Sequence, residues 1–373
     1  MRTGSILRKR RASEKVYVPK DARDNQYVIA EMPLTDELIK LVVGDIDLTA
    51  EKPYQKFYQK LAKLAFDVVE ECNISHANFV ANSRLVRVRH SEEQQVLHTP
   101  QQSFFFYSPL HNSTFKGYYD GTHRSNKVKF LFLATGEELR VNSGDFHAKV
   151  HKAVKEISKR IGLAEGALKM RDHQHLTYDI FAKEKGRKES ITHTFREISA
   201  RYLQQGYEIE GKHNFITYAV VSIPMSRRLL KDVELDYNVD DIYAPIYKKI
   251  DDAFKSSAAK HNLTHAAMIA NGNSVIVRYD EGENTQFNGE IISLGFNPKN
   301  DATDIVSLYE ADKLVDNIRL VYFADEFDET HKTYGKFVNQ VTDSIKSLAD
   351  ELNWNKERDY MLMRLHQQIV RKV

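Results

Sequence analysis

The sequence predicts an α+β protein that arose by tandem duplication of a ferredoxin-like unit, in which two helices cover one face of a mainly antiparallel sheet. Three observations support this prediction. One stretch of sequence recurs in the second half, apolar residues recur at helical spacing in each half, and alternating or apolar runs between those helices indicate strands. We expect the copies to pair about a pseudo-twofold axis, as homodimers do about a true one.

The repeat is clearest in two segments that align without gaps, NISHANFVANSRLVRVR (73–89) and NLTHAAMIANGNSVIVR (262–278). Eight of the 17 positions are identical, where about one identity is expected from residue frequencies. Further matches pair YVIAEMP with YAVVSIP, PYQKFYQKLAKLA with YAPIYKKIDDAFK, VKFLFLA with IRLVYFA, and MRDHQ with MRLHQ. The chain is therefore divided into a basic arm (1–20), copy one (21–183), a helical linker (184–212) and copy two (213–373).

Each copy is expected to have the element order β-α-β-β-β-β-α-β. In copy one, apolar stripes predict the two helices, the first through Phe57, Leu61 and Val68 and the second from Phe146 to Ile161. The linker carries a third stripe within 190–207, which predicts a helix. The turn residues Asn82-Ser83 and Asn271-Gly272 predict a hairpin between the first two strands after the first helix. The strands of this region are expected at 76–82, 85–90, 103–108 and 128–134.

Composition and charge limit the classes of protein to which the chain can belong. No apolar run is long enough to span a bilayer, and the basic N-terminal residues are not followed by the apolar region of a secretory signal. The single cysteine, Cys72, excludes an intramolecular disulfide. We therefore expect a cytoplasmic protein without membrane contact, present as a monomer or weak homo-oligomer. The net charge of +2 conceals a charge of +6 on residues 1–20 and of −6 on residues 213–373.

A site that serves both copies should use polar residues kept in both. His76 with His265 and Asn82 with Asn271 suit helix-end and turn roles, so we expect them to be structural. An Arg-x-His-Gln motif is a better candidate, because an arginine beside a histidine on one strand face can bind an anion. A buried polar network is the alternative explanation of this motif. Its residues are Arg171, His173 and Gln174 in copy one, and Arg364, His366 and Gln367 in copy two.

Two enzymatic hypotheses rest on histidines. His147 and His151 have a helical spacing that can chelate a metal, but we expect them far from His173 and His175, and therefore predict neither a metal nor another cofactor. His175-Leu176-Thr177 and His331-Lys332-Thr333 resemble the H-x-T signature of the two-histidine phosphoesterases. That resemblance implies acid and base roles for His175 and His331, and phosphate positioning by Thr177 and Thr333.

Nucleic-acid binding is indicated by the basic cluster Arg8, Lys9, Arg10 and Arg11, which could attract RNA or an acidic protein. The run Phe104–Tyr107 cannot form one stacking platform because successive strand residues alternate faces, and we assign these aromatics to the core. Phosphate-loop, dinucleotide-binding, zinc-protease and nucleophile-elbow motifs are all absent from the sequence.

The segment KVYVPKDARDNQYVIAEMP (15–33) resembles the start of an uncharacterised bacterial protein family of unknown function, a resemblance that implies no activity. The sequence therefore favours a cytoplasmic, non-catalytic binding or regulatory protein with an acidic partner such as RNA or a ribonucleoprotein. A phosphoesterase of the two-histidine type and a structural or assembly protein are the alternatives.

Overall fold

The structure is a computed structural model whose described residues exclude the N-terminal arm, the linker and several loops. The predicted linker helix therefore lies outside the described residues. Among the residues that are described, no helix is long and apolar enough to cross a membrane. The described ranges are 23–91, 93–100, 102–108, 114–135, 143–164, 166–181, 214–225, 233–271, 274–279, 285–288, 291–297, 304–324, 333–354 and 361–373.

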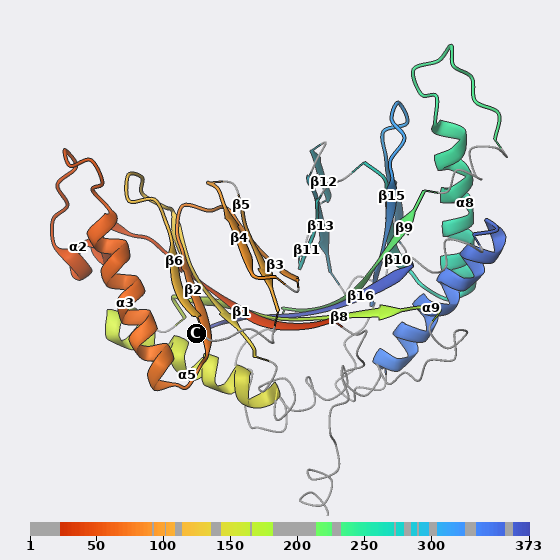
Figure 1. Ribbon diagram of the computed structural model, residues 1–373. Coiled ribbons are helices and arrows are strands. Elements are labelled where there is room, and N and C mark those ends of the chain that lie inside the picture. The colour runs from red at the N-terminus through yellow and green to blue at the C-terminus, as the bar shows by residue number, and fades with distance from the viewer. Residues whose placement is uncertain are drawn as a thin grey trace, which may run out of the picture. The chain divides into compact units, whose positions relative to one another are not determined.

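The chain forms two compact units, each with a main sheet, helices on one face of that sheet and a small three-stranded sheet on the other (Figure 1). Of the described residues, unit 1 contains 23–174 and 369–373. Its main sheet has the strand order β6-β2-β7-β1-β8. The helices and strands that begin in the first half of the chain are β1 (Arg23–Pro33), α2 (Asp36–Val43), α3 (Gln55–Glu71), β2 (His76–Val80), β3 (Leu85–His90), β4 (Gln95–His98), β5 (Gln102–Tyr107), β6 (Thr114–Tyr118), β7 (Lys127–Leu133), α5 (Ser143–Ile161) and β8 (Lys169–Asp179).

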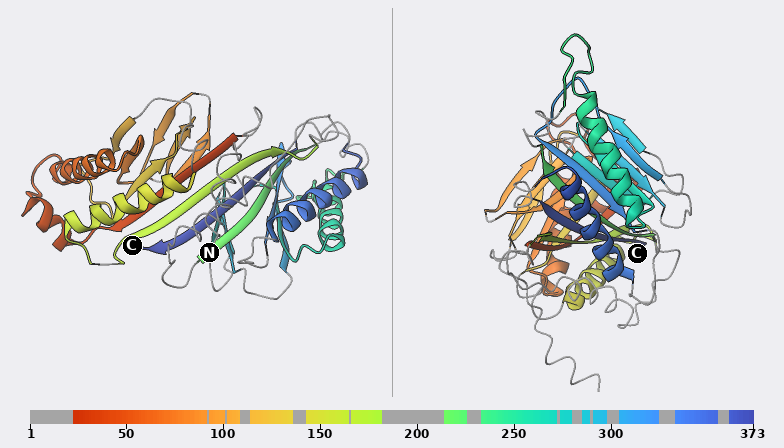
Figure 2. Two further views of the ribbon diagram at one scale, coloured as in Figure 1. Left: turned by 90° about the horizontal axis from the view of Figure 1, so that it is seen from below. Right: turned by 90° about the vertical axis from the view of Figure 1, so that its right-hand side faces the viewer.

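Unit 1 has the ferredoxin-like topology that the sequence predicts. Its path β1-α3-β2-β7-α5-β8 places β1 between β7 and β8, with β2 beyond β7. The pairs β1–β7 and β2–β7 are antiparallel, whereas the added edge strand β6 runs parallel to β2. Two further views show that α3 and α5 lie on the same face of this sheet (Figure 2).

Unit 2 repeats this arrangement with the strand order β14-β10-β15-β9-β16 and the helices α8 and α9. The predicted α+β fold and tandem duplication are therefore confirmed, while the pseudo-twofold relation stays a prediction. The remaining elements are β9 (Asn214–Pro224), α8 (Ala244–Lys260), β10 (His265–Ile269), β11 (Ser274–Tyr279), β12 (Thr285–Asn288), β13 (Ile291–Phe296), β14 (Asp304–Leu308), β15 (Asn317–Phe323), α9 (Thr333–Glu351) and β16 (Leu362–Lys372).

The predicted hairpin after the first helix is wrong in both units. β2 and β3 do not pair, because β3 leaves the main sheet and forms a separate sheet of order β3-β5-β4. In unit 2, β11, β13 and β12 make the corresponding sheet. Asn82 has a φ of 56°, which turns the chain out of the main sheet after β2. The strands β4 and β6, which are short and largely polar, were not predicted.

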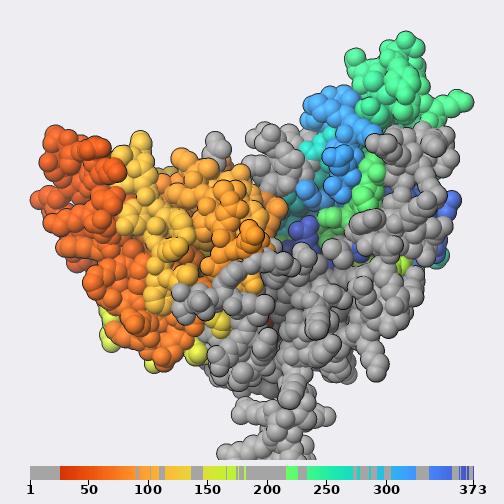
Figure 3. Space-filling view, viewed as in Figure 1, coloured from red at the N-terminus to blue at the C-terminus, as the bar shows by residue number. Residues whose placement is uncertain are grey.

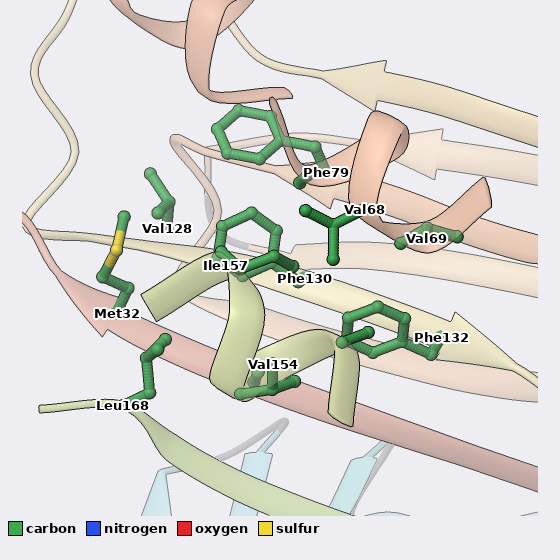
Figure 4. Close-up of a cluster of buried hydrophobic side chains, with 14 of the residues drawn as sticks. Met32, Val68, Val69, Phe79, Val128, Phe130, Phe132, Val154, Ile157 and Leu168 are labelled. Atoms are coloured by element: carbon green, nitrogen blue, oxygen red, sulfur yellow. The ribbon is translucent and has the colours of Figure 1, made fainter. Parts of the chain in front are cut away.

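Alternation along β1 divides the core of unit 1 into two layers. Val28, Ala30 and Met32 face the helices, whereas Tyr27 and Ile29 face the small sheet. The helix-side layer contains side chains from α3, α5, β1, β2 and β7 together with Leu168, and some of them are labelled in Figure 4. The main sheet is therefore buried on both faces, which explains why its strands are almost continuously apolar.

Residues 369–373 belong to unit 1, although most of β16 belongs to unit 2. Val373 is buried in the helix-side layer of unit 1. Its backbone N–H donates to the carbonyl of Leu168 at 2.8 Å, and the Leu168 N–H donates to the Val373 carbonyl at 3.2 Å. The core of unit 1 is thus completed by the last residues of copy two.

A buried histidine–carboxylate contact distinguishes the two units. His147 Nδ1 on α5 lies 3.3 Å from Asp172 Oδ1 on β8, and both side chains are buried. This contact corrects the expectation that the start of the helix is remote from the histidine-bearing strand, because β8 runs back along α5. The aligned residues of copy two are Val338 and Leu365, which are apolar and buried.

We predict that His147→Val alone lowers the free energy of unfolding by about 2–4 kcal/mol, because a buried carboxylate loses its neighbouring imidazole. The double variant His147→Val with Asp172→Leu, which copies unit 2, should recover most of this loss. Urea denaturation monitored by circular dichroism measures both values. Equal destabilisation by the single and double variants would contradict the assignment.

Candidate nucleic-acid interface

The two faces of the small sheet in unit 1 differ in chemistry. Phe105 and Tyr107 are buried against the main sheet, with each side chain 2% exposed. Phe104 and Phe106 point the other way and are half-buried. The expectation that the whole aromatic run is core is therefore correct for only two of its four residues, because alternation sends the other two to the outer face.

On that outer face, two arginines of β3 lie over the phenylalanines of β5. The Cζ atoms of Arg87 and Arg89 are each 5.6 Å from the centroid of the Phe104 ring, within the range of a cation–π interaction. The rings of Phe104 and Phe106 are stacked, with centroids 6.3 Å apart and planes 22° apart. We call Arg87, Arg89, Phe104 and Phe106 the Arg–Phe face.

The strand register explains how this face is assembled. β3 and β5 are parallel, which places Arg87 opposite Phe104 and Arg89 opposite Phe106. On the other side of β5, Leu97 of β4 is opposite Phe104, and its side chain is 48% exposed. No acidic residue occupies an outward position on these three strands. The face is therefore cationic and aromatic, and Arg89 is exposed to solvent.

Unit 2 lacks this combination. The residues aligned with Arg87, Phe104 and Phe106 are Ile276, Ser293 and Gly295. Arg278, aligned with Arg89, lies opposite Gly295, and its side chain is not described. The Arg–Phe face is consequently a property of unit 1, whereas the small sheet that carries it is common to both units.

The Arg-x-His-Gln motifs make equivalent contacts in the two units. The His173 ring stacks on Tyr27 with centroids 4.5 Å apart, and the His366 ring stacks on Tyr218 at the same distance. Arg171 Nη2 lies 3.5 Å from Glu31 Oε2, whereas Arg364 Nη2 donates to Ser222 Oγ at 3.1 Å. The side chains of Gln174 and Gln367 are not described. Each motif therefore contacts the neighbouring strand of its own sheet, β1 in unit 1 and β9 in unit 2.

Glu31 lies in a cationic cluster in unit 1. Lys127 Nζ is 3.0 Å from its carboxylate, and Lys129 is directly opposite it on β7. Burial raises the pKa of Glu31, but the charges of Arg171, Lys127 and Lys129 outweigh this effect and lower it. Burial lowers the pKa of Lys129 to about 8, and its ammonium donates to the carbonyls of Ser83 and Arg84. Lys129 therefore fixes the chain where it enters the small sheet.

The shared histidines and asparagines occupy buried or turn positions. The His76 ring packs edge-on against Tyr107, and the His265 ring packs in the same way against Phe296. Asn82 accepts from the Asp120 N–H at 3.0 Å through Oδ1, and Asn271 Oδ1 accepts from the Glu310 N–H at 2.7 Å. These asparagines hold the loops that lead into β7 and β15.

In each unit a tyrosine that the sequence did not single out holds the equivalent loop. Tyr58 Oη accepts from the Ser125 N–H at 2.8 Å and donates to a loop carbonyl. Tyr247 Oη accepts from the Val315 N–H at 3.1 Å and likewise donates to a loop carbonyl. Aligning PYQKFYQ with YAPIYKK hid this match, because it placed Tyr58 against Lys248. The structure requires an alignment shifted by one residue.

The residues of the phosphoesterase hypothesis are only partly described. His331 lies outside the described residues, and the side chains of Thr177 and Thr333 are not described. The His175 ring packs edge-on against His366, with centroids 4.1 Å apart. Burial, and secondarily the charge of Arg364, lowers the pKa of His175 to about 3. The imidazole is therefore neutral at pH 7, which weighs against a role as general acid.

Within the described ranges, no group of three or more histidine, cysteine, aspartate or glutamate side chains could hold a metal ion. Cys72 is buried, and burial raises the pKa of its thiol, as expected for a packing residue. The basic cluster Arg8–Arg11 lies outside the described residues.

A family model described as "Protein of unknown function (DUF3083)" matches residues 5–83 and 56–370. The chain belongs to this family. The resemblance of its N-terminal region to an uncharacterised family thus agrees with a match over most of the chain. No curated protein matches the chain. Membership of the DUF3083 family identifies no activity, so the function has to be inferred from the geometry of the described residues.

We predict that Glu31→Gln lowers the free energy of unfolding by about 2 kcal/mol at pH 7, because the cationic cluster loses its carboxylate. Since the pKa of Glu31 is lowered by folding, its contribution is present above the ordinary value of 4.5 and is lost as the pH falls through the folded value. The difference between wild type and variant should therefore shrink below about pH 4.5. Urea denaturation at several pH values measures this, and a constant difference would contradict it.

Proposed function

We propose that the chain is a non-catalytic binding protein whose acidic partner is single-stranded RNA, contacted by the Arg–Phe face of unit 1. The observation that carries the proposal is the placement of two guanidinium groups by Phe104, whose ring stacks with that of Phe106, on the outer face of the β3-β5-β4 sheet. Proteins that bind single strands commonly combine aromatic side chains, which stack on bases, with cations that follow the phosphates.

Geometry favours a single strand over a duplex. The bases of a duplex stack on one another, and their faces are not available to a flat sheet surface. Phe104 and Phe106 are two residues apart on one strand, so their rings follow each other along β5. An extended single strand can offer one base to each ring, while Arg89 remains exposed for a phosphate.

The comparison of the two units supports a role in ligand binding for Phe104 and Phe106. The buried positions of the small sheets stay apolar in both units, as Phe105 and Leu294 illustrate. At the outward positions, unit 2 has Ser293 and Gly295 where unit 1 has phenylalanines. Folding alone therefore does not require aromatic rings there. Aromatic side chains on an outer face that the fold does not need are candidates for ligand contact.

We predict that Phe104→Ala with Phe106→Ala weakens binding of a fluorescein-labelled oligouridine by at least about tenfold, because base–aromatic stacking contributes roughly 1–3 kcal/mol per base. Arg89→Ala should flatten the plot of log affinity against log salt by about 0.7, the contribution of one phosphate contact on a single strand. Fluorescence anisotropy at several salt concentrations measures both effects.

The matched control is Phe115→Ala with Lys116→Ala, which removes one aromatic and one cation from exposed positions on β6. It should bind like wild type. Deleting residues 2–15 measures the separate contribution of the basic arm to the salt dependence. Absence of RNA binding by the intact chain, or equal loss in the control, would overturn the proposal. Equal affinity for DNA of the same sequence would broaden the ligand to any single strand.

A further inference from the structure

An exposed apolar residue is presented in the same way by both units. It lies in the segment before the first long helix, which we call tip 1 (residues 45–54, before α3) and tip 2 (residues 234–243, before α8). Leu48 in tip 1 is 70% exposed, and Tyr237 in tip 2 is 75% exposed. Tip 2 projects beyond the N-terminal end of α8 (Figure 1) and forms the green knob of the space-filling view (Figure 3).

The two tips are built alike. Asp47 Oδ1 accepts the Thr49 N–H at 2.9 Å, and Asp236 Oδ1 accepts the Asn238 N–H at 2.9 Å. The side chain of the same residue donates a second hydrogen bond to that oxygen in each tip, from the Thr49 hydroxyl and from the Asn238 amide. The apolar residue between these partners is therefore held in a turn that is closed by its neighbours' side chains.

The residues after the tips show that the positions are equivalent. Tyr54 and Tyr243 both occupy the N-cap position of the following helix. The Tyr54 N–H donates to the Gly121 carbonyl, and the Tyr243 N–H donates to the Ala311 carbonyl, each at 2.9 Å. Leu48 and Tyr237 each precede that tyrosine by six positions. Burial follows the same order in both tips, with Ile46 and Leu235 half-buried and followed by six consecutive exposed residues.

Single exposed apolar residues are common and need no explanation by themselves. Here the side chain changes from Leu to Tyr between copies, yet its exposure and its turn are kept. The fold does not use either side chain, because both are largely in solvent. A side chain held in a closed turn also loses less conformational entropy on binding, so it suits an anchor that enters a partner's recess.

The flanking charges select the kind of partner. Tip 1 carries Asp45, Asp47 and Glu51 against one lysine, and tip 2 carries four acids and no base, Glu234, Asp236, Asp240 and Asp241. Nucleic acids and anionic membranes would be repelled by these carboxylates. A protein surface that has an apolar recess bordered by lysine or arginine could accept the apolar side chain and attract the carboxylates.

We infer that tips 1 and 2 are docking elements for a basic protein partner, with Leu48 and Tyr237 as apolar anchors and the surrounding carboxylates as the electrostatic contact. The residues of the tips differ from those of the Arg–Phe face, and the inference does not depend on the proposed RNA binding.

The test uses the full-length chain as bait for a phage-displayed library of random peptides. Wild type should enrich peptides that combine lysine or arginine with apolar residues. The double variant Leu48→Ser with Tyr237→Ser should bind a synthesised peptide from this selection about tenfold more weakly in fluorescence anisotropy, as expected for loss of an apolar anchor. Added salt should weaken the wild-type complex, because exposed charges are screened.

The matched control is Leu314→Ser, which replaces an apolar residue that is 37% exposed outside the tips and should leave peptide binding unchanged. Circular dichroism melting shows whether each variant remains folded. Enrichment of acidic or neutral peptides, no enrichment, or equal binding by wild type and the double variant would each overturn the inference.

Discussion

Burial of the main sheet on both faces is the constraint on which the rest of each unit depends. In unit 1, helices cover the side of Val28 and Met32, and the small sheet covers the side of Tyr27 and Ile29. Every residue of these strands must therefore suit one of two interiors. Polar groups that remain there, such as Glu31 with its neighbouring cations, persist because partners surround them. The outer side of the small sheet escapes this constraint and can vary between copies.

The duplication separates what the fold requires from what it permits. The tyrosines Tyr58 and Tyr247 hold equivalent loops, and the rings of His173 and His366 stack on equivalent tyrosines. Such pairs are kept because each satisfies local hydrogen bonds or packing. The buried His147–Asp172 contact and the Arg–Phe face occur in unit 1 alone among the described residues. Differences of this kind mark places where one copy could acquire a role without loss of structure in the other.

Periodicity in the sequence predicts the helices, most strands and the duplication, because burial on a regular element leaves a regular pattern. It fails where the pattern is short or two-sided. β4 and β6 are polar edge strands, and the turn at Asn82 leads to another sheet although its sequence favours a local hairpin. The outward direction of Phe104 depends on which face the small sheet turns to the core. No local signal encodes that choice, so the Arg–Phe face could not be predicted.

The pairing of Val373 with Leu168 has a consequence for biosynthesis. These residues are about 200 positions apart, and contacts of such long range form late because closing the intervening loop is entropically costly. Copy one therefore cannot complete its core while the end of copy two is still on the ribosome. Although the two halves are repeats of one fold, the first depends on the end of the second for its last contacts.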